Sequence, residues 1–476
     1  MRLLAAATAL VAALLGGATS ARALDVGAND DSARYQDDRG AAMFAQMREL
    51  GLTRVVIGVR HTPSDPLAIP GREGLAEAVE AASAAGLRVV LAVYPYPPRE
   101  LEAGVGSPVR FAAFVAEVAR TFPAVRAFVI GNEPNQPAFW RPQFDASGRN
   151  VSAAAFGAYL AAAYDALEAV DPSITVIGVG LSPRGNDKPS ARNNVSTSPI
   201  RFLRSLGAWY RASGRTRPLM DAFSFHPYPR EATDPLDRGY GWPNAGFVNL
   251  DRVKQALWDA FHGTPQPTTL NGLAIHLDEV GWQVDTALRE GYRGDENVRV
   301  TDEASQAEIY GELVRRAACD PDVASLSFFG FRDDGLRTGF QTGLQRVDGS
   351  PRPASAAVRQ ALSEVAGGCP SPAARWRPAR TVLDASVAVE ARGARLLTRI
   401  STGEDARATV CVRSIRTGRI TTCRTVSVVG LRPALVALPA RRALRSRLEV
   451  AVDLEAEANA ARRSRQVLRA YPEARS

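Results

Sequence analysis

The feature that most constrains the fold is an alternation of two sequence textures between residues 24 and 370. Short runs of apolar and β-branched residues recur eight times. Each run is followed by an Ala-, Leu- and Glu-rich segment with apolar residues every three to four positions. The first texture is typical of buried strands and the second of amphipathic helices. Strands that alternate with helices predict a parallel sheet, and eight units favour a closed barrel over an open doubly wound sheet.

The predicted strands cover residues 24–27, 54–59, 89–93, 127–130, 174–179, 222–225, 274–277 and 324–329. The predicted helices cover residues 40–50, 74–85, 109–121, 153–170, 199–212, 250–261, 303–318 and 354–366. No G-x-G-x-x-G or P-loop motif follows the first strand, which also disfavours an open nucleotide-binding sheet. We therefore predict an α/β fold, a (β/α)8 TIM barrel, over residues 24–370.

The texture changes after Cys369. Residues 370–378 form a Pro-, Ala- and Arg-rich linker, and the following segments alternate as half-buried strands do. They predict a small all-β, sandwich-like domain over residues 371–476, with an Arg-rich tail from Asn459. This part contains 21 Arg and no Lys against 9 Asp and Glu, a net charge of +12, whereas residues 24–370 carry −6. The total of +8 therefore does not indicate a polyanion-binding barrel.

The N-terminus has the pattern of a secretory signal peptide over residues 1–23. Arg2 is followed by a short apolar run, and Ala21-Arg22-Ala23 has the small residues of a cleavage site. The run is short for a membrane span, and no later stretch reaches 18 apolar residues, so no transmembrane helix is expected. An uncleaved anchor is the alternative to export, and we expect a secreted protein.

Four cysteines in an exported chain suggest disulfides. Cys411 and Cys423 bracket a predicted hairpin, and Cys319 and Cys369 each follow a helical pattern. Sequence alone leaves all three pairings open. The four histidines are scattered, no Cys/His spacing matches a metal site, and no cofactor is implied.

Polar and aromatic residues follow several predicted strands, at the end where barrel enzymes carry their active sites. Glu133 follows the fourth strand and Glu279 the seventh, so both are expected on one face of the barrel. Two facing carboxyl groups suit the hydrolysis of a glycosidic bond, in which one protonates the leaving oxygen and the other attacks or activates water. Asp278 competes with Glu279, but neighbours on a strand point to opposite faces, and we assign Glu279 to the pocket.

Other side chains at the strand ends fit the same chemistry. Arg60 and Tyr228 are hydrogen-bond donors that would keep a nucleophilic carboxylate ionised. Sugars present apolar ring faces, for which Trp282, Trp140 and Tyr94 are candidate platforms.

With these residues, the chain resembles clan A retaining glycoside hydrolases, near families 5 and 39, over residues 24–370. The resemblance implies that Glu133, in the Asn132-Glu133 pair after strand four, is the acid/base and that Glu279 is the nucleophile. It also implies that the Asn132 amide bonds the 2-hydroxyl of the substrate.

The resemblance extends to three supporting residues. Arg60 matches an Arg on strand two that supports the nucleophile, and His226 and Tyr228 match a His-x-Tyr motif at strand six, whose hydroxyl holds it. One departure concerns strand eight, where many clan members place a Trp under the sugar. Residues 328–331 read Phe-Phe-Gly-Phe here, which puts the substrate in question more than the reaction, because Trp282 is available as an alternative platform.

The sequence thus predicts a secreted retaining glycoside hydrolase that cleaves O-glycosidic bonds, of β-linked sugars, by double displacement. The alternative is an inactive barrel that binds polysaccharide. A carbohydrate esterase is disfavoured because the chain has no G-x-S-x-G motif. The expected partner is an oligo- or polysaccharide and not nucleic acid, since the basic segment lacks interleaved aromatic residues. A weak contact of this segment with anionic cell-wall polymers is kept as a hypothesis.

Overall fold

The computed structural model describes residues 23–378, 383, 385–392, 395–402, 405–428, 433–439, 448–457 and 462–470. The predicted signal peptide lies outside the described residues, apart from its last residue, so export stays a prediction. Across the described ranges, no helix is both long enough and apolar enough to cross a bilayer.

Eight parallel strands close into a barrel in the order β1 to β8, with β8 pairing back to β1. The strands are β1 (Asp25–Asn29), β2 (Arg54–His61), β3 (Arg88–Pro95), β4 (Ala127–Ile130), β5 (Thr175–Leu181), β6 (Ala222–Phe225), β7 (Ala274–Val280) and β8 (Val323–Phe329). This confirms the TIM barrel that the sequence predicts.

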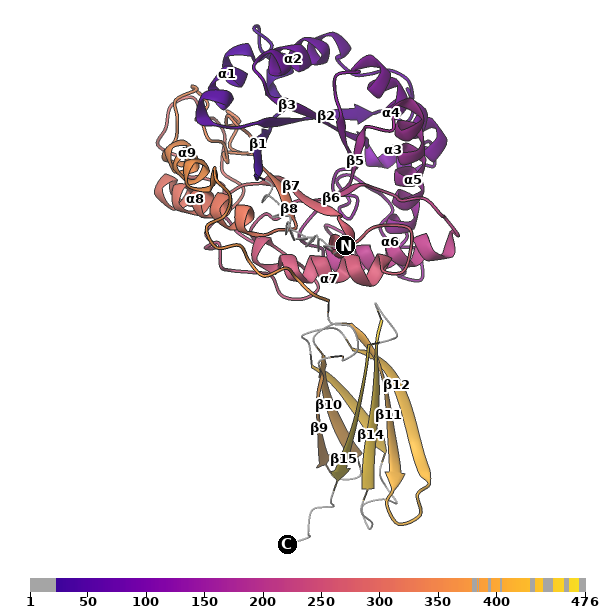
Figure 1. Ribbon diagram of the computed structural model, residues 1–476. Coiled ribbons are helices and arrows are strands. Elements are labelled where there is room, and N and C mark those ends of the chain that lie inside the picture. The colour runs from indigo at the N-terminus through magenta and orange to yellow at the C-terminus, as the bar shows by residue number, and fades with distance from the viewer. Residues whose placement is uncertain are drawn as a thin grey trace, which may run out of the picture.

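Helices surround the strands, as Figure 1 shows. They are α1 (Ala41–Leu50), α2 (Arg72–Ala84), α3 (Pro98–Glu102), α4 (Pro108–Thr121), α5 (Ser152–Val170), α6 (Pro199–Ala212), α7 (Leu250–Phe261), α8 (Glu303–Cys319) and α9 (Pro353–Val365). Short 3-10 helices cover Ser32–Tyr35, Phe247–Asn249 and Thr269–Asn271. Each predicted helix is present. The short α3 was not predicted, because its sequence is rich in proline. Local sequence sets the boundaries: Pro108 opens α4, and the Ser107 side chain accepts from the Arg110 amide.

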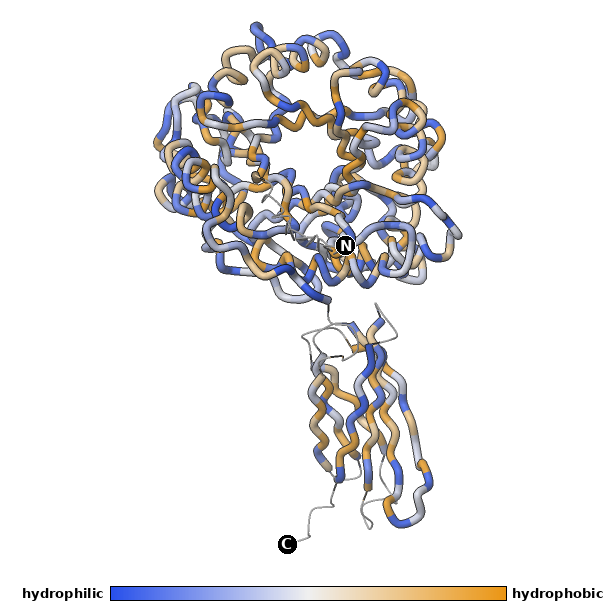
Figure 2. The backbone as a smooth tube through the Cα atoms, in the orientation of Figure 1, coloured by the Kyte–Doolittle hydropathy of each residue, from blue (hydrophilic) through white to orange (hydrophobic). Residues whose placement is uncertain are grey.

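The barrel strands bury apolar side chains on both faces, which is why they read as apolar runs rather than as alternating ones. The outward face packs against the helices in one large core, to which Val55, Ile57 and Leu91 belong. The inward face holds a separate small cluster that includes Val56 and Val90. Figure 2 shows this apolar ring of strands at the centre of the barrel.

Two of the strands carry an extra residue close to the end that bears the pocket. Between the pairs Leu277↔Leu326 and Val280↔Phe328, β7 advances three residues while β8 advances two. The pairing of β5 with β6 shifts in the same way between Gly178 and Leu181. Such β-bulges break the simple alternation of side chains and re-aim them, and they are frequent beside active sites.

The C-terminal domain consists of two antiparallel sheets, with strand orders β13-β10-β9 and β12-β11-β14-β15. The strands are β9 (Ala385–Arg392), β10 (Arg395–Thr402), β11 (Ala406–Ser414), β12 (Ile420–Val428), β13 (Ala434–Pro439), β14 (Leu448–Ala456) and β15 (Arg463–Ala470). The last strand corrects the expected tail from Asn459, because β15 pairs along its length with β14. Alternate residues of the strands, including Val410 and Val450, form the core between the sheets.

Both disulfides join cysteines that the sequence singles out. Cys411 and Cys423 face each other across the β11–β12 hairpin, and Cys319, at the end of α8, is bonded to Cys369, which follows α9. Some arginines of the C-terminal domain are paired with its own acidic residues. On the exposed face of the larger sheet, acidic residues of β14 bind arginines of β11 and β15. The hypothesis of a cell-wall contact stays a prediction.

Candidate active site

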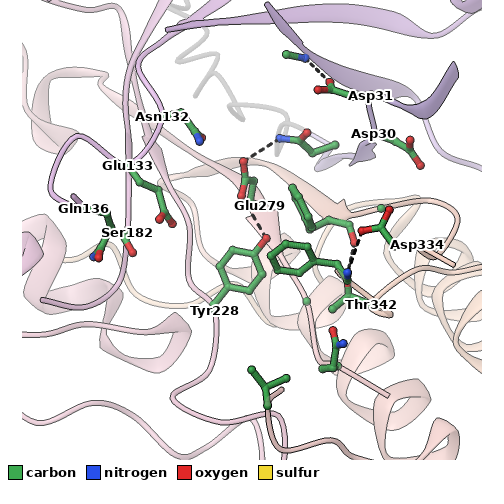
Figure 3. Close-up of a pocket in the computed structure, with 18 of the residues that line it drawn as sticks. Asp30, Asp31, Asn132, Glu133, Gln136, Ser182, Tyr228, Glu279, Asp334 and Thr342 are labelled. Carbon is green, nitrogen blue, oxygen red and sulfur yellow. Dashed lines mark hydrogen bonds between the residues drawn. The ribbon is translucent and has the colours of Figure 1, made fainter. Parts of the chain in front are cut away.

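A cavity of about 1020 Å³ opens at the carboxyl ends of the barrel strands. Every strand, or the loop that follows it, contributes to its wall. The contributing residues include, in strand order, Asn29, Arg60, Tyr94, Glu133, Ser182, Tyr228, Glu279 and Phe329. The two predicted catalytic glutamates therefore share one cavity, and Figure 3 shows their carboxyl groups inside it, with Asn132 beside Glu133.

The bulge in β7 determines which acidic side chain enters the cavity. Ala274, His276 and Asp278 occupy the inward face before the bulge, whereas Glu279 and Gly281 line the cavity beyond it. Glu279 thus takes the position that the sequence predicts, but the physical reason is different. Simple alternation does not separate the two acids, because the extra residue turns both towards the barrel axis at different depths.

Asp278 lies below the cavity, in the interior of the barrel. Its carboxylate forms a salt bridge of 3.0 Å with Arg54, and both side chains are almost completely buried. Arg54 also contacts the ring of His276, which in turn bonds Ser325. A buried carboxylate that is paired in this way has its charge compensated and is not available to substrate.

Hydrogen-bond donors surround the Glu279 carboxylate. The Asn29 side-chain amide donates to Oε1 over 3.3 Å, and the Tyr228 hydroxyl donates to Oε2 over 3.2 Å. Nδ1 of His226 lies 3.5 Å from the same Oε2 atom. Three groups on β1 and the loop after β6 therefore favour the ionised form of Glu279.

Glu133 is held differently, by its backbone. It lies in the loop after β4 with φ at 42°, in the left-handed region that non-glycine residues seldom adopt. Its amide donates to the carbonyl oxygen of Gly180, on the bulged β5, over 2.6 Å. The side chain contacts Nδ1 of His226 over 3.3 Å. A strained backbone that its surroundings fix is typical of functional positions.

His226 connects the two glutamates. Its Nδ1 atom contacts Oε1 of Glu133 and Oε2 of Glu279 at 3.3 and 3.5 Å, and its side chain is 2% exposed. Because one nitrogen contacts both oxygens, these two oxygens lie no more than about 7 Å apart. His226 is not among the residues that line the cavity, and it contacts the two glutamates from its buried position.

The pKa values follow from burial and from this cluster. Burial opposes the charge on His226, but the carboxylates of Glu279 and Glu133 outweigh it and raise the His226 pKa to about 9. Burial raises the pKa of Glu279 to about 7, although the His226 cation and the Tyr228 hydroxyl act in the opposite direction. Burial and the two carboxylates also raise the pKa of Tyr228 well above its ordinary value. This hydroxyl therefore stays protonated and donates a hydrogen bond to Glu279.

Arg60 lines the cavity but does not have the role expected from the resemblance. Its Nε atom donates to the Tyr94 hydroxyl over 3.2 Å, and its guanidinium lies over the ring of Tyr96. Support of the Glu279 carboxylate comes instead from Asn29, which the sequence analysis missed. Asn29 ends β1, whose predicted span stops two residues earlier, and its position at a strand end is the signal that could have identified it.

The predicted tryptophan platforms are wrong. Trp282 lies two residues after Val280, beyond the bulge, and therefore points to the same outward side. Its side chain faces the helices and is 2% exposed. Its indole nitrogen donates to the carbonyl oxygen of Asp234. Trp140 is 3% exposed and packs edge-on against Phe156. Both rings are therefore part of the core and cannot stack on a sugar.

Phenylalanines and tyrosines provide the aromatic surface of the cavity. Tyr94 lines it, as predicted, and packs against Phe139 of the loop after β4. Phe340, in the loop after β8, also lines the cavity and is 47% exposed. It contacts Phe329, the last residue of β8. The sequence gives no signal for Phe340, because it lies in a long loop.

Among the residues that the structure describes, no three or more His, Cys, Asp or Glu side chains are grouped so as to hold a metal ion. The acidic residues of the cavity wall near β1 and β8 have structural contacts. Asp31 accepts from the Gly58 amide, and Asp30 accepts from the Phe331 amide.

No family model matches the sequence, and no curated protein sequence matches it. Solved structures match the fold. GH5_18 from Streptomyces cattleya, in complex with GlcNAc, matches at a TM-score of 0.50 and 16% identity, over 76% of this chain and 84% of that chain. A family 39 glycoside hydrolase from Bacteroides cellulosilyticus WH2 matches at a TM-score of 0.49 and 16% identity, over 88% and 81%. The likeness to GH5_18 therefore shows that the chain shares the barrel fold of that protein.

Proposed function

We propose that the protein is a secreted retaining glycoside hydrolase, with Glu279 as nucleophile and Glu133 as acid/base. The observation that carries the proposal is the shared contact of His226 with both carboxyl groups in one open cavity. Retaining enzymes need carboxyl groups roughly 5–5.5 Å apart and inverting enzymes roughly 6.5–9.5 Å. The upper limit of about 7 Å set by His226 leaves only the lowest part of the inverting range.

In the first step, the ionised Glu279 attacks the anomeric carbon while Glu133 protonates the leaving oxygen. Oε1 and Oε2 of Glu279 accept from Asn29 and Tyr228, which aim the carboxylate and stabilise its charge before attack. The bond between the anomeric carbon and the leaving oxygen breaks, and a covalent glycosyl-enzyme forms on Glu279.

In the second step, Glu133 is ionised because its proton has left with the first product. It removes a proton from water, which attacks the anomeric carbon and releases Glu279 as a carboxylate. The His226 cation lies against both groups and reduces the repulsion between them whenever both are ionised. Asn132, on the cavity wall next to Glu133, is the candidate partner of the 2-hydroxyl.

The donor asymmetry supports the division of roles. Asn29, Tyr228 and His226 all contact Glu279, and the group that must stay ionised is the one with the most donors. Within the described residues, the Glu133 carboxyl has His226 as its hydrogen-bond partner, and its side chain is more exposed, at 17% against 13%. A proton donor needs this freedom to reach the leaving oxygen.

The shape of the cavity supports an oligo- or polysaccharide substrate. Its volume of about 1020 Å³ is at the upper end of the roughly 300–1,000 Å³ of small-molecule sites. Tyr94, Phe139 and Phe340, which all line the cavity, offer apolar faces to sugar rings. We propose β-linked substrates because of the resemblance of the glutamate motifs.

The test is hydrolysis of a panel of aryl β-glycosides and β-linked polysaccharides by the purified protein. NMR of the first-formed product is expected to show the β-anomer. A 2-deoxy-2-fluoro glycoside with a good leaving group is expected to add one sugar to the peptide that contains Glu279. Formation of the α-anomer from a β-substrate would overturn retention. Binding of a polysaccharide without turnover of any substrate would favour the inactive barrel instead.

Export is tested separately. N-terminal sequencing of the protein recovered from the medium of its native host is expected to begin near Leu24. Retention inside the cells, with Met1 still present, would contradict the signal peptide.

A further inference from the structure

The C-terminal domain touches the barrel through a nearly buried carboxylate, Asp405, which directly precedes β11. Its Oδ2 atom accepts from Nε of Arg201 on α6 over 2.7 Å, and its Oδ1 atom accepts from the indole of Trp242 over 3.1 Å. The Asp405 side chain is 8% exposed. Hydrogen bonds that join a charged donor to a charged acceptor away from water are among the stronger ones in proteins. Figure 1 shows the domain beside α7.

The first of these contacts leads to the loop between β5 and α6, residues 182–198. Arg201 also pairs with Asp187 of this loop over 3.2 Å. The Asp187 carboxylate accepts in turn from the Ser198 amide at the start of α6. The same loop forms part of the cavity wall through Ser182 and Arg184. Arg201 is thus shared between the C-terminal domain and an active-site loop.

The second contact leads to the loop between β6 and α7, residues 226–246, which contains Trp242. Two residues earlier, the Tyr240 hydroxyl donates to the carbonyl oxygen of Tyr228 over 3.3 Å. The Tyr228 hydroxyl donates to Glu279. Two hydrogen bonds and a short stretch of backbone therefore connect Asp405 with the Tyr228 side chain that holds the nucleophile.

The two loops also bind each other. The Gly185 amide donates to the Asn244 side chain, and the Ala245 amide donates to the Pro183 carbonyl, both over 2.9 Å. They form one wall of the cavity, and Asp405 contacts the 226–246 loop directly through Trp242 and the 182–198 loop indirectly, through Arg201 and Asp187.

We infer that Asp405 is a positioning residue through which the C-terminal domain holds the 182–198 and 226–246 loops in their active arrangement. The domain then acts on the barrel's own site and is not only an attachment to polysaccharide. This inference rests on the proposed function for its effect on catalysis, but not for its effect on the loops themselves.

Three variants of the full chain separate this role from general stabilisation. Asp405→Asn keeps the size and one acceptor but removes the charge that Arg201 binds. Trp242→Phe removes only the indole donor. The matched control is Glu457→Gln at the same interface. Glu457 pairs with Arg204 on α6 over 2.8 Å, and Arg204 also lies 3.5 Å from Asp405, so this variant alters the Arg204 pairing and leaves the Arg201 and Trp242 contacts in place.

The first readout is hydrogen exchange of the two loops, which needs no substrate. Asp405→Asn is expected to speed exchange at least tenfold in residues 182–198 and 226–246. Trp242→Phe is expected to do so in residues 226–246 alone, and Glu457→Gln in neither. Exchange in the α8–α9 region reports global stability, and equal acceleration there would overturn the inference.

The second readout is the pH profile of kcat/KM on an aryl glycoside. A loosened Tyr228 donates less well to Glu279, and this hydrogen bond lowers the Glu279 pKa, so the acidic limb is expected to move to higher pH in Asp405→Asn. We expect a loss of roughly tenfold at neutral pH, as for a weakened hydrogen bond to a charged group. Unchanged loop exchange and an unchanged limb in both Asp405→Asn and Trp242→Phe would overturn the inference. If the wild type hydrolyses no glycoside, the proposed function fails while loop exchange still decides the role of Asp405.

Discussion

The end of β7 and the loop after β4 carry the two glutamates, and they hold them by opposite means. Glu279 sits on a strand and is fixed through its side chain, by Asn29, Tyr228 and His226. Glu133 sits on a loop and is fixed through its backbone, in a left-handed conformation with its amide bonded to Gly180. In the proposed mechanism, the nucleophile is thus restrained at its reacting atoms, whereas the proton donor is placed by its backbone and has fewer hydrogen-bond partners at its carboxyl group.

The largest expected effect comes from removing each carboxylate in turn. Glu279→Gln is expected to lose about 10⁴-fold or more in kcat on every substrate, as removal of a nucleophile does. Glu133→Gln is expected to lose roughly 10²–10⁴-fold on substrates with poor leaving groups, but much less on kcat/KM for activated aryl glycosides, whose departure needs no proton. Equal losses of activity in Glu133→Gln on both kinds of substrate would contradict the role of Glu133 as proton donor.

The pH dependence sharpens the same comparison. Because the Glu279 pKa is raised to about 7 and the carboxylate must be ionised to attack, kcat/KM of the wild type is expected to fall roughly tenfold per pH unit below 7. The negative charge of Glu133 contributes to that raised pKa, so Glu133→Gln is expected to move the acidic limb to lower pH. Profiles of kcat/KM on an activated glycoside would measure it. A limb that stays in place or moves to higher pH would contradict the assigned coupling.

The donor shell of Glu279 is tested by Tyr228→Phe. Loss of a hydrogen bond to a charged group, about 1.5–3 kcal/mol, is expected to lower kcat/KM roughly 10- to 100-fold near neutral pH. The acidic limb is expected to move to higher pH, because this bond lowers the Glu279 pKa. Tyr164→Phe is the matched control, since the Tyr164 hydroxyl bonds Asp221 away from the cavity. A loss of the same size in the control would remove the argument.

The smallest expected effect concerns the cavity wall rather than the glutamates. Phe340→Ala is expected to raise KM for oligosaccharides by up to about tenfold, the worth of about 1.4 kcal/mol of stacking, with kcat little changed. Leu336→Ala in the same loop is the control, because Leu336 is 55% exposed and does not line the cavity. Titration with oligosaccharides of increasing length would show whether Phe340 contacts a ring.

The sequence predicts those site residues that a strand end and a motif mark together. Glu133, Glu279 and Tyr228 belong to this group, because a barrel gathers the carboxyl ends of its strands on one face. The fold could be predicted as well, because the spacing of apolar residues indicates strands and helices without knowledge of any tertiary contact. The β15 strand was missed because a segment so rich in arginine is typical of a solvated tail. In the structure, β14 provides acidic partners for these arginines, such as Glu455 for Arg463.

Other residues could not be predicted because their direction depends on contacts between distant segments. Arg60 has the right residue type and the right strand, but it contacts Tyr94 of the neighbouring strand β3 and Tyr96, which follows that strand. Trp282 has the right neighbourhood, but its ring is turned into the core. Asp405 lies in a different domain from its partners Arg201 and Trp242, and no local pattern joins them.

The bulge in β7 changes which residues of the strand point to the inside of the barrel. Before the bulge, the inward side chains are those of the even-numbered residues 274, 276 and 278. After it, they belong to the odd-numbered residues 279 and 281, because one extra residue shifts the alternation. Deleting one residue between Leu277 and Val280 would therefore do more than shorten a strand. Because only Asp278 and Glu279 lie there, it would remove the extra residue and leave one acidic side chain instead of two on the inward face of β7, without changing the side to which Trp282 points.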